Sequence, residues 1–385
     1  SFRRAAAGPA GLENAVRECL EKDGAAGLIL CGTEEEVLFA QDPKTACSIP
    51  TVIVGPWDGV DPDGGTKACG VRLSRPRALV ARACAMFMAR TLKAGRVGLV
   101  IGSKDARDVR LAAMVSEGLA GTRTHLVHTV VLSGGSTDGG GLGRLVSARP
   151  DVVFVSASGS RALEVIRELR LHGGCPGIVL AEPPVEGSPR GFEARVLDGV
   201  YVQSDFIEGT VTSPGGRYFL SYCRSHRGHG GSPGVLEATG AESYLLAVEL
   251  ISGAERRGME AALRDAAARQ SVLLAAGCAR CEGSKPERFQ FGRYERRFTG
   301  EASLEAVAAL EIGPSDPVAY VGTQELFGHH GEVGPVDALL DLVFDIPDLV
   351  HAHVGCVHDR PVDVLHELDR SGDVHAVERG LVPVL

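Results

Sequence analysis

Hydrophobic positions follow two alternating patterns over the first 200 residues of the chain. Short uninterrupted runs of Val, Ile and Leu are typical of strands that are buried on both faces. Such runs predict strands at 27–30, 51–54, 97–101, 124–132, 151–155, 178–180 and 199–202. Between them, apolar residues recur three or four positions apart, which predicts amphipathic helices at 12–20, 34–40, 77–92, 108–119, 142–147 and 160–171. This alternation predicts an α/β protein with doubly wound parallel sheets, covered by helices on both faces.

Four of the predicted strands begin near residues 96, 124, 151 and 177, a spacing that is typical of repeated strand–helix units. From residue 205 the pattern changes, and helices are expected at 218–225, 236–251 and 259–274. A separate strand–helix rhythm begins after Pro314. The chain is therefore expected to contain a long doubly wound part and a shorter C-terminal part.

Composition excludes several classes of protein. The length of 385 residues suggests two or three domains, and the net charge of −9 argues against a nucleic-acid-binding protein. No apolar run approaches the ~20 residues of a membrane span, and no charged-then-apolar leader opens the sequence. The 50 glycines gather largely at the ends of the predicted strands.

The ten cysteines are scattered along the chain, mostly on apolar faces. This distribution is more typical of reduced core thiols than of a disulfide scaffold, and it favours a cytoplasmic protein. The pair Cys278 and Cys281 has the spacing of metal ligands, but no second pair would complete a zinc site. His351 and His353 would share one face of a strand, where a solvated surface is a more common explanation than a metal site. We therefore expect no metal and no other cofactor.

The sequence shows no established catalytic motif. Phosphate-binding loops, a GxSxG elbow and an HExxH helix are absent, and the glycine-rich residues 134–141 are expected to form a plain strand–helix connection. Cys31 directly follows a predicted strand, where a thiol could act as a nucleophile, although a buried thiol at such a place is more often structural. We predict that the chain is not an enzyme and has no catalytic residues.

Binding remains the better interpretation. In open parallel sheets, ligands bind beyond the carboxyl ends of the strands. Polar loops are expected at those ends, at residues 31–34, 55–58, 103–105, 156–160 and 182–183. Hydroxyls and helix-start N–H groups suit a carboxylate, and Asp or Glu suits an ammonium. Trp57, the single tryptophan, either covers an apolar ligand group or anchors its loop.

Several short motifs occur in an order that matches a known family. They are 96–100 (RVGLV), 136–138 (STD), 148–155 (ARPDVVFV), 167–173 (RELRLHG), 197–201 (LDGVY), 218–222 (YFLSY), 238–248 and 289–292 (FQFG). In this order they resemble the type I periplasmic binding protein family, in the branch of branched-chain amino acid and amide receptors. The resemblance spans roughly residues 10–312.

The resemblance implies two doubly wound lobes with a ligand in the cleft between them. It places residues 1–93 and 208–275 in lobe 1, and residues 94–207 and 276–312 in lobe 2. Residues 313–385 would form a small C-terminal α+β extension. The implied function is that of a non-enzymatic protein that closes on a small polar ligand such as an amino acid, an amide or a related small acid.

The resemblance also implies eight ligand-binding residues. Those of lobe 1 are Thr33, Glu34, Trp57 and Asp58, and those of lobe 2 are Asp105, Ser156, Ser158 and Asp198. Thr33 would hold a carboxylate, and Asp198 would face the ligand ammonium. Glu34 stands where the family has a serine, and it would repel an α-carboxylate unless it points away.

The chain departs from the family at both ends. The family's opening strand, glycine-rich loop and helix do not precede the segment that matches residues 8–30. Residues 317–344 could supply this unit, or the extension could be a separate sandwich similar to the ligand-sensing domains of amino-acid-responsive regulators, which we favour.

Three functions stay open at this point. The leading one is a binding protein that serves an ABC transporter permease or a signalling partner. Two copies of the chain could also form a homodimer. A cytoplasmic sensor is favoured, and a cell-envelope receptor is the alternative. The other two functions are an enzyme that uses Cys31 or a metal in the histidine-rich tail, and a ligand-free assembly module.

Overall fold

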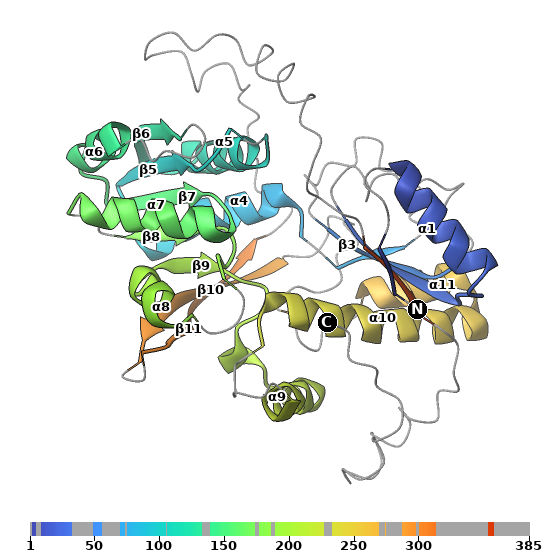
Figure 1. Cartoon of the computed structure of the whole chain (residues 1–385). Helices are drawn as coiled ribbons and strands as arrows, with labels where there is room; N and C mark the ends of the chain where they lie inside the picture. Colours follow the sequence, from blue (N-terminus) through green and yellow to red (C-terminus); the bar gives the residue numbers. More distant parts are fainter. Residues whose placement is uncertain are drawn as a thin grey trace.

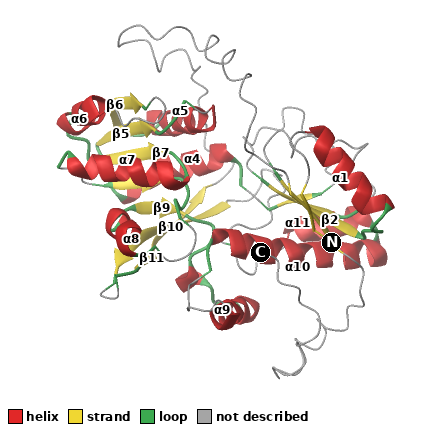
Figure 2. Ribbon diagram, viewed as in Figure 1, coloured by secondary structure: helices red, strands yellow, loops and turns green. Residues whose placement is uncertain are grey.

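The computed structural model shows two α/β lobes side by side (Figures 1 and 2). It describes residues 2–4, 9–32, 49–55, 70–73, 75–104, 106–132, 139–173, 177–185, 189–226, 233–268, 274, 287–297, 300–312 and 353–357. The predicted helix at 34–40, the glycine-rich residues 134–138 and the Cys278–Cys281 pair lie outside this set.

Lobe 2 is built on a seven-stranded sheet with the order β11-β10-β9-β8-β7-β5-β6. The strands β5 to β9 run parallel, whereas β10 and β11 form an antiparallel hairpin at the edge beside β9. The strands are β5 (Arg96–Ile101), β6 (His125–Val131), β7 (Val152–Ser156), β8 (Ile178–Leu180), β9 (Tyr201–Gln203), β10 (Glu287–Arg296) and β11 (Ala302–Ile312).

The apolar strands of lobe 2 are covered by helices on both faces, as the uninterrupted hydrophobic runs predict. Every residue of β7 and β8 is buried. One face packs against α4 (Arg77–Met86) and α5 (Ala106–Ala120). The other packs against α6 (Gly139–Ser147), α7 (Gly159–Leu171) and α8 (Gly191–Leu197). The doubly wound prediction is confirmed for this lobe.

Lobe 1 contains a five-stranded sheet with the order β1-β12-β2-β3-β4. The strands are β1 (Phe2–Arg4), β2 (Gly27–Cys31), β3 (Thr51–Val54), β4 (Val71–Arg72) and β12 (His353–Val357). Helix α1 (Pro9–Glu21) packs against β2 in one small core. A second core of this lobe contains β3, β4 and three helices from later in the chain. These helices follow the 3-10 turn η2 (Glu208–Thr210) and are α9 (Pro214–His226), α10 (Val235–Arg257) and α11 (Met259–Ala268).

The position of α4 corrects the predicted lobe boundary. We expected residues 1–93 to lie in lobe 1, but the buried face of α4 and the following π-helical turn η1 (Phe87–Thr91) belong to the core of lobe 2. The Phe87 ring stacks on Phe291 of β10 at a centroid distance of 4.0 Å. The chain therefore passes into lobe 2 near Arg75, directly before α4.

One strand of the C-terminal segment lies inside the sheet of lobe 1. Strand β12 pairs antiparallel with β2 on one side, where His353 faces Cys31, and with β1 on the other. We favoured a separate sandwich for residues 313–385, but this described strand extends the lobe 1 sheet beside β2. Residues 317–344, the segment that could supply the family's missing opening unit, lie outside the described residues.

None of the described helices is long and apolar enough to cross a membrane. Helix α10 is the longest described helix of lobe 1, but its sequence is interrupted by exposed charged residues such as Glu249 and Glu255.

Cys19 corrects the expectation of reduced cysteines, because this buried residue of α1 is disulfide-bonded. Cys31, Cys84 and Cys223 are not disulfide-bonded. A disulfide is typical of proteins from oxidising compartments. It therefore weakens the argument for a cytoplasmic protein that the scattered cysteines gave.

We expect unreduced, denatured protein to expose no more than eight reactive thiols out of ten, because one disulfide removes two. The measurement is alkylation with iodoacetamide in denaturant, followed by intact-mass spectrometry. The same protein reduced before alkylation is the control and should show all ten. Ten alkylated cysteines without reduction would contradict the disulfide at Cys19.

Candidate functional site

The carboxyl ends of β5, β7 and β8 form the polar edge of lobe 2 and are neighbours in the sheet. Two of their loops touch closely. The Gly102 N–H donates to the Ser156 carbonyl at 2.8 Å, and a Cβ on Gly102 would lie only 2.4 Å from the Cβ of Ala157. Glycine is therefore needed at position 102 to bring the two loops together.

The two predicted serines of this edge have different surroundings. Ser156 is fully buried, and its Oγ donates to the Asp108 carbonyl in α5 at 2.7 Å, which ties β7 to that helix. Ser158 is half-buried and extended at the start of α7, and its hydroxyl makes no cap hydrogen bond to the helix. An anion would be stabilised there by the partial positive charge of the helix start. Ser158 is thus the better placed of the two to meet a ligand.

Charged side chains of both signs lie at the same edge. Arg107 of α5 forms an ion pair with Glu182, the second residue after β8, at 2.6 Å. Arg161 in the first turn of α7 donates from Nε to the Gly102 carbonyl at 2.8 Å and pairs with Glu164. Arg107 and Glu182 are each about 40% exposed. Because such solvent-exposed pairs contribute little to stability, ligand charges can replace either partner at low cost.

The structure brings together only part of the predicted site. Ser156 and Ser158 share the polar edge of lobe 2. Asp198 lies at a different edge of the sheet. The remaining five of the eight predicted residues lie outside the described residues: Thr33, Glu34, Trp57, Asp58 and Asp105. The contribution of lobe 1 therefore stays a prediction.

Asp198 lies at the opposite edge of the sheet, which corrects its predicted place beside these serines. It follows α8 and precedes β9, at the amino end of a strand that runs parallel to β8. At about 3.3 Å per residue, the five residues of β7 separate the two edges by ~15 Å. Its carboxylate accepts the Arg296 N–H at 3.1 Å, and its carbonyl accepts from the Arg170 guanidinium. Asp198 thus joins α8 to β10.

Glu182 is the acidic residue that the site prediction missed. It stands two residues beyond β8, in the polar loop that the sequence places at a carboxyl strand end. The sequence signal that could have identified Glu182 is the end of the hydrophobic run at Leu180. In a parallel strand, the polar residues that follow such a run lie at the carboxyl edge of the sheet. Arg107 also went unrecognised, because it lies inside an amphipathic helix with nothing in its local pattern to distinguish it.

The catalytic and metal alternatives gain little from the described residues. Burial raises the pKa of the Cys31 thiol to about 11, which keeps it protonated near neutral pH and makes it a poor nucleophile. Within the described ranges, no group of three His, Cys, Asp or Glu residues could hold a metal ion. The histidines of the C-terminal segment other than His353 lie outside those ranges.

No protein-family model and no curated protein sequence matches the chain. Solved structures do share its fold. The leucine-binding protein LivK of Thermotoga maritima has a TM-score of 0.56 and 15% identity, and the match covers 81% of this chain and 86% of that one. LivJ of Streptococcus pneumoniae in complex with isoleucine has a TM-score of 0.60 and 14% identity, and the match covers 78% of this chain and 84% of that one. A solute-binding protein of Rhodopseudomonas palustris BisB5 in complex with 3,4-dihydroxybenzoic acid has a TM-score of 0.60 and 15% identity, and the match covers 79% of this chain and 84% of that one.

These similarities show the fold class. The chain has the two-lobed α/β fold of ABC transporter substrate-binding proteins of the type I periplasmic class, as the resemblance in its sequence implies.

Proposed function

We propose that the chain is a non-enzymatic binding protein that closes its two lobes on a small polar ligand, such as an amino acid, an amide or a related small acid. The observation that carries the proposal is the Arg107–Glu182 pair at the polar edge of lobe 2, the edge at which Ser158 also lies. This arrangement offers a cation, an anion and a hydroxyl within one sheet edge, at the end where open parallel sheets bind ligands. The structural neighbours, crystallised with isoleucine or 3,4-dihydroxybenzoic acid, support the same class of ligand.

In this proposal the two lobes contribute different groups. Glu182 faces a ligand ammonium, Arg107 faces an acidic group, and Ser158 donates to a ligand oxygen. Ser156 positions α5 from behind. Thr33, Glu34, Trp57 and Asp58 form the wall of lobe 1, and Asp105 adds to that of lobe 2. A ligand that touches both lobes favours the closed form, because it gains contacts that the open form lacks.

We expect Glu182→Gln to weaken the binding of an amine-bearing ligand by at least tenfold. A hydrogen bond to a charged group contributes about 1.5–3 kcal/mol, and tenfold corresponds to about 1.4 kcal/mol. The ligand is first found by thermal-shift screening with amino acids, amides and small carboxylic acids, and its affinity is then measured by calorimetry. Glu13→Gln is the matched control, since Glu13 forms an exposed ion pair with Arg17 in α1 of the other lobe.

Two outcomes would contradict the proposal. One is the absence of a thermal shift with every compound of the screen. The other is a loss of affinity of the same size in Glu182→Gln and Glu13→Gln, which would show that the polar edge of lobe 2 does not contact the ligand.

We further propose that the protein works in the cell envelope and delivers its ligand to an ABC transporter permease. The disulfide at Cys19 supports this compartment over the cytoplasm. A soluble sensor that passes its signal to a partner protein is the second candidate, and the thiol count described above bears on the choice between them.

A further inference from the structure

Three loops at the amino edge of lobe 2 carry an excess of positive charge. They precede β5, β6 and β7, which are neighbours in the sheet, and they lie at the opposite edge from Glu182. Residues 90–96, 120–125 and 144–151 hold six Lys or Arg residues and one carboxylate, although the whole chain has a net charge of −9. All six are exposed: Arg90, Lys93, Arg96, Arg123, Arg144 and Arg149. We call this surface the cationic edge.

Hydrogen bonds join the three loops into one platform. Asp151, the single carboxylate of these ranges, accepts the Arg96 N–H at 2.9 Å, and Arg96 Nε donates to the Arg149 carbonyl at 3.1 Å. Thr124 Oγ1 donates to the Ala94 carbonyl at 2.8 Å, which ties the loop before β6 to the loop before β5. The backbone that carries the cations is therefore fixed from loop to loop.

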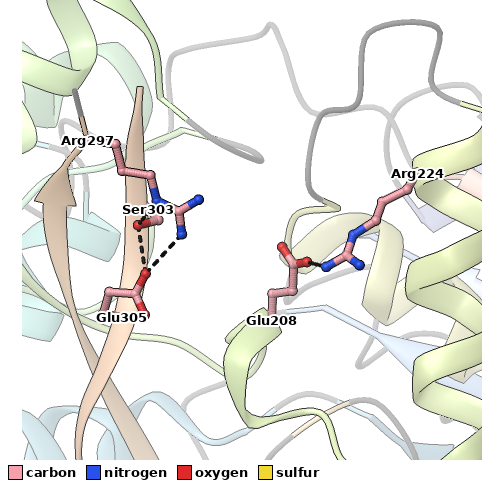
Figure 3. A network of polar contacts seen from close by, with 5 residues as sticks. All are labelled: Glu208, Arg224, Arg297, Ser303 and Glu305. Carbon is pink, nitrogen blue, oxygen red and sulfur yellow. Dashed lines mark hydrogen bonds and ion pairs between the residues drawn. The ribbon is translucent and has the colours of Figure 1, made fainter. Parts of the chain in front are cut away.

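Most of the cations have no carboxylate partner. Within the part of the chain that the structure describes, five of the six form no ion pair: Arg90, Lys93, Arg123, Arg144 and Arg149. Other exposed arginines do, as Figure 3 shows for Arg224 with Glu208 and for Arg297 with Glu305. Because like charges repel, a group of unpaired cations lowers stability until an anionic surface lies against it.

Two of these cations also hold a backbone conformation that favours glycine. Lys93 has a φ of 53° and Arg149 a φ of 49°, and they are the only described residues other than glycine with a positive φ. Each lies two residues after the end of a helix, Lys93 after η1 and Arg149 after α6, where glycine is common. A side chain is strained there and glycine is not. At both places the chain keeps a cation where glycine would relieve strain.

The chemistry of the cationic edge favours one kind of partner. Protein interfaces usually centre on aromatic anchors, and single-stranded nucleic acids stack on aromatic rings. The three ranges contain no Phe, Tyr or Trp, and none of the exposed large hydrophobic residues lies in them. Anionic lipid headgroups require no such anchor, because they attract Lys and Arg by charge.

We propose that the cationic edge binds the surface of a membrane that contains anionic lipids. Lys93, Arg123 and Arg149 lie against the headgroups, and the polar edge with Glu182 is directed away from them. The proposed cell-envelope location places such a surface within reach. Lipid binding itself depends neither on that location nor on the proposed ligand, so the proposals can fail separately.

The test is co-sedimentation of the full chain with vesicles of phosphatidylglycerol and phosphatidylcholine in equal parts, compared with vesicles of phosphatidylcholine alone. We expect binding to the anionic vesicles only. It should be lost when salt is raised from about 0.05 M to about 0.5 M, because salt screens exposed charges. Lys93→Gln/Arg149→Gln should weaken it by about 25-fold, since each cation near an anionic surface contributes about fivefold.

Arg217→Gln/Arg256→Gln is the matched control, because it removes two exposed arginines of lobe 1 and changes the net charge by the same amount. This variant should keep its binding. The proposal is overturned if the anionic vesicles are not bound at low salt, or if the two double variants lose affinity equally. It is also overturned if poly-L-glutamate is bound more tightly than the vesicles at the same salt, since the partner is then an acidic protein.

Lys93→Gly/Arg149→Gly separates a role in lipid binding from a role in folding. Glycine adopts a positive φ without strain, so the thermal midpoint should not fall, whereas vesicle binding should weaken as it does in the glutamine variant. A lower midpoint together with unchanged binding would show that the two residues serve the fold alone, which overturns the proposal.

Discussion

Phe87→Ala should lower the free energy of unfolding of lobe 2 by about 4 kcal/mol, because it opens a cavity in the core that holds this lobe together. Phe87 is fully buried at the start of the π-helical turn η1. Its ring stacks on Phe291 at 4.0 Å and meets the edge of Tyr201 at 5.6 Å. The substitution removes both aromatic contacts and the anchor that fixes the end of α4 to the sheet.

Urea denaturation, followed by circular dichroism, measures this loss. Phe192→Ala is the matched control, because Phe192 in α8 is 50% exposed and its removal leaves no buried cavity. We expect the control to change the free energy of unfolding by less than about 1 kcal/mol. Equal losses in the two variants would show that the stacked rings do not stabilise lobe 2.

The sequence predicted the strands and helices of lobe 2 well, because burial on both faces requires uninterrupted apolar strands. The runs at 151–155 and 178–180 became β7 and β8, and the periodic segment at 160–171 became α7. These patterns are local, since each depends only on which face of a short segment meets the core. Local burial is the property that hydrophobic periodicity records.

The assignment of α4 to a lobe was wrong for a physical reason. Its apolar stripe predicts that one face is buried, but an amphipathic helix can cover either of two neighbouring sheets with the same stripe. The structure places the buried Ala81 and Ala85 in the core of lobe 2. Strand β12 could not be placed either, because its partner β2 lies near the other end of the sequence and no local signal joins them.

The candidate site shows a similar limit. Acidic residues lie at both ends of the β8–β9 region, with Glu182 at the carboxyl edge and Asp198 at the amino edge. The sequence assigned the ammonium contact to Asp198 through a family motif, although the strand direction favours Glu182. Strand direction decides at which edge of the sheet each residue lies, because it follows from how the chain enters and leaves the sheet, and it places Glu182 at the carboxyl edge and Asp198 at the amino edge.

Asp205→Ala should have the second large effect, because Asp205 forms an ion pair with an arginine at a crossing between the lobes. Arg75 lies between β4 and α4, where the chain enters lobe 2, and Asp205 follows β9, where the chain leaves it. The Arg75 side chain is 2% exposed, and its Nε lies 3.1 Å from Asp205 Oδ1. Its guanidinium also lies 4.1 Å from the centre of the Phe289 ring.

Removing one partner of a buried ion pair costs about 3–5 kcal/mol, because the other charge stays buried with less compensation. We expect about 3 kcal/mol for Asp205→Ala, at the lower end of that range, since Asp205 itself is 25% exposed. Urea denaturation measures the loss. Asp265→Ala is the matched control, because Asp265 pairs with Arg257 where both side chains are about half exposed, and its removal should change stability by less than about 1 kcal/mol.

Arg75→Met separates the role of charge from that of packing at the same crossing. Methionine keeps an apolar chain against the Phe289 ring and leaves only the 25%-exposed Asp205 carboxylate, which keeps its hydrogen bond from Gln203 Nε2, whereas Asp205→Ala leaves the fully buried Arg75 charge in place. We therefore expect Arg75→Met to be the less damaging of the two variants. If Asp205→Ala instead loses no more stability than Asp265→Ala, packing against Phe289 holds this crossing between the lobes, and the ion pair does not.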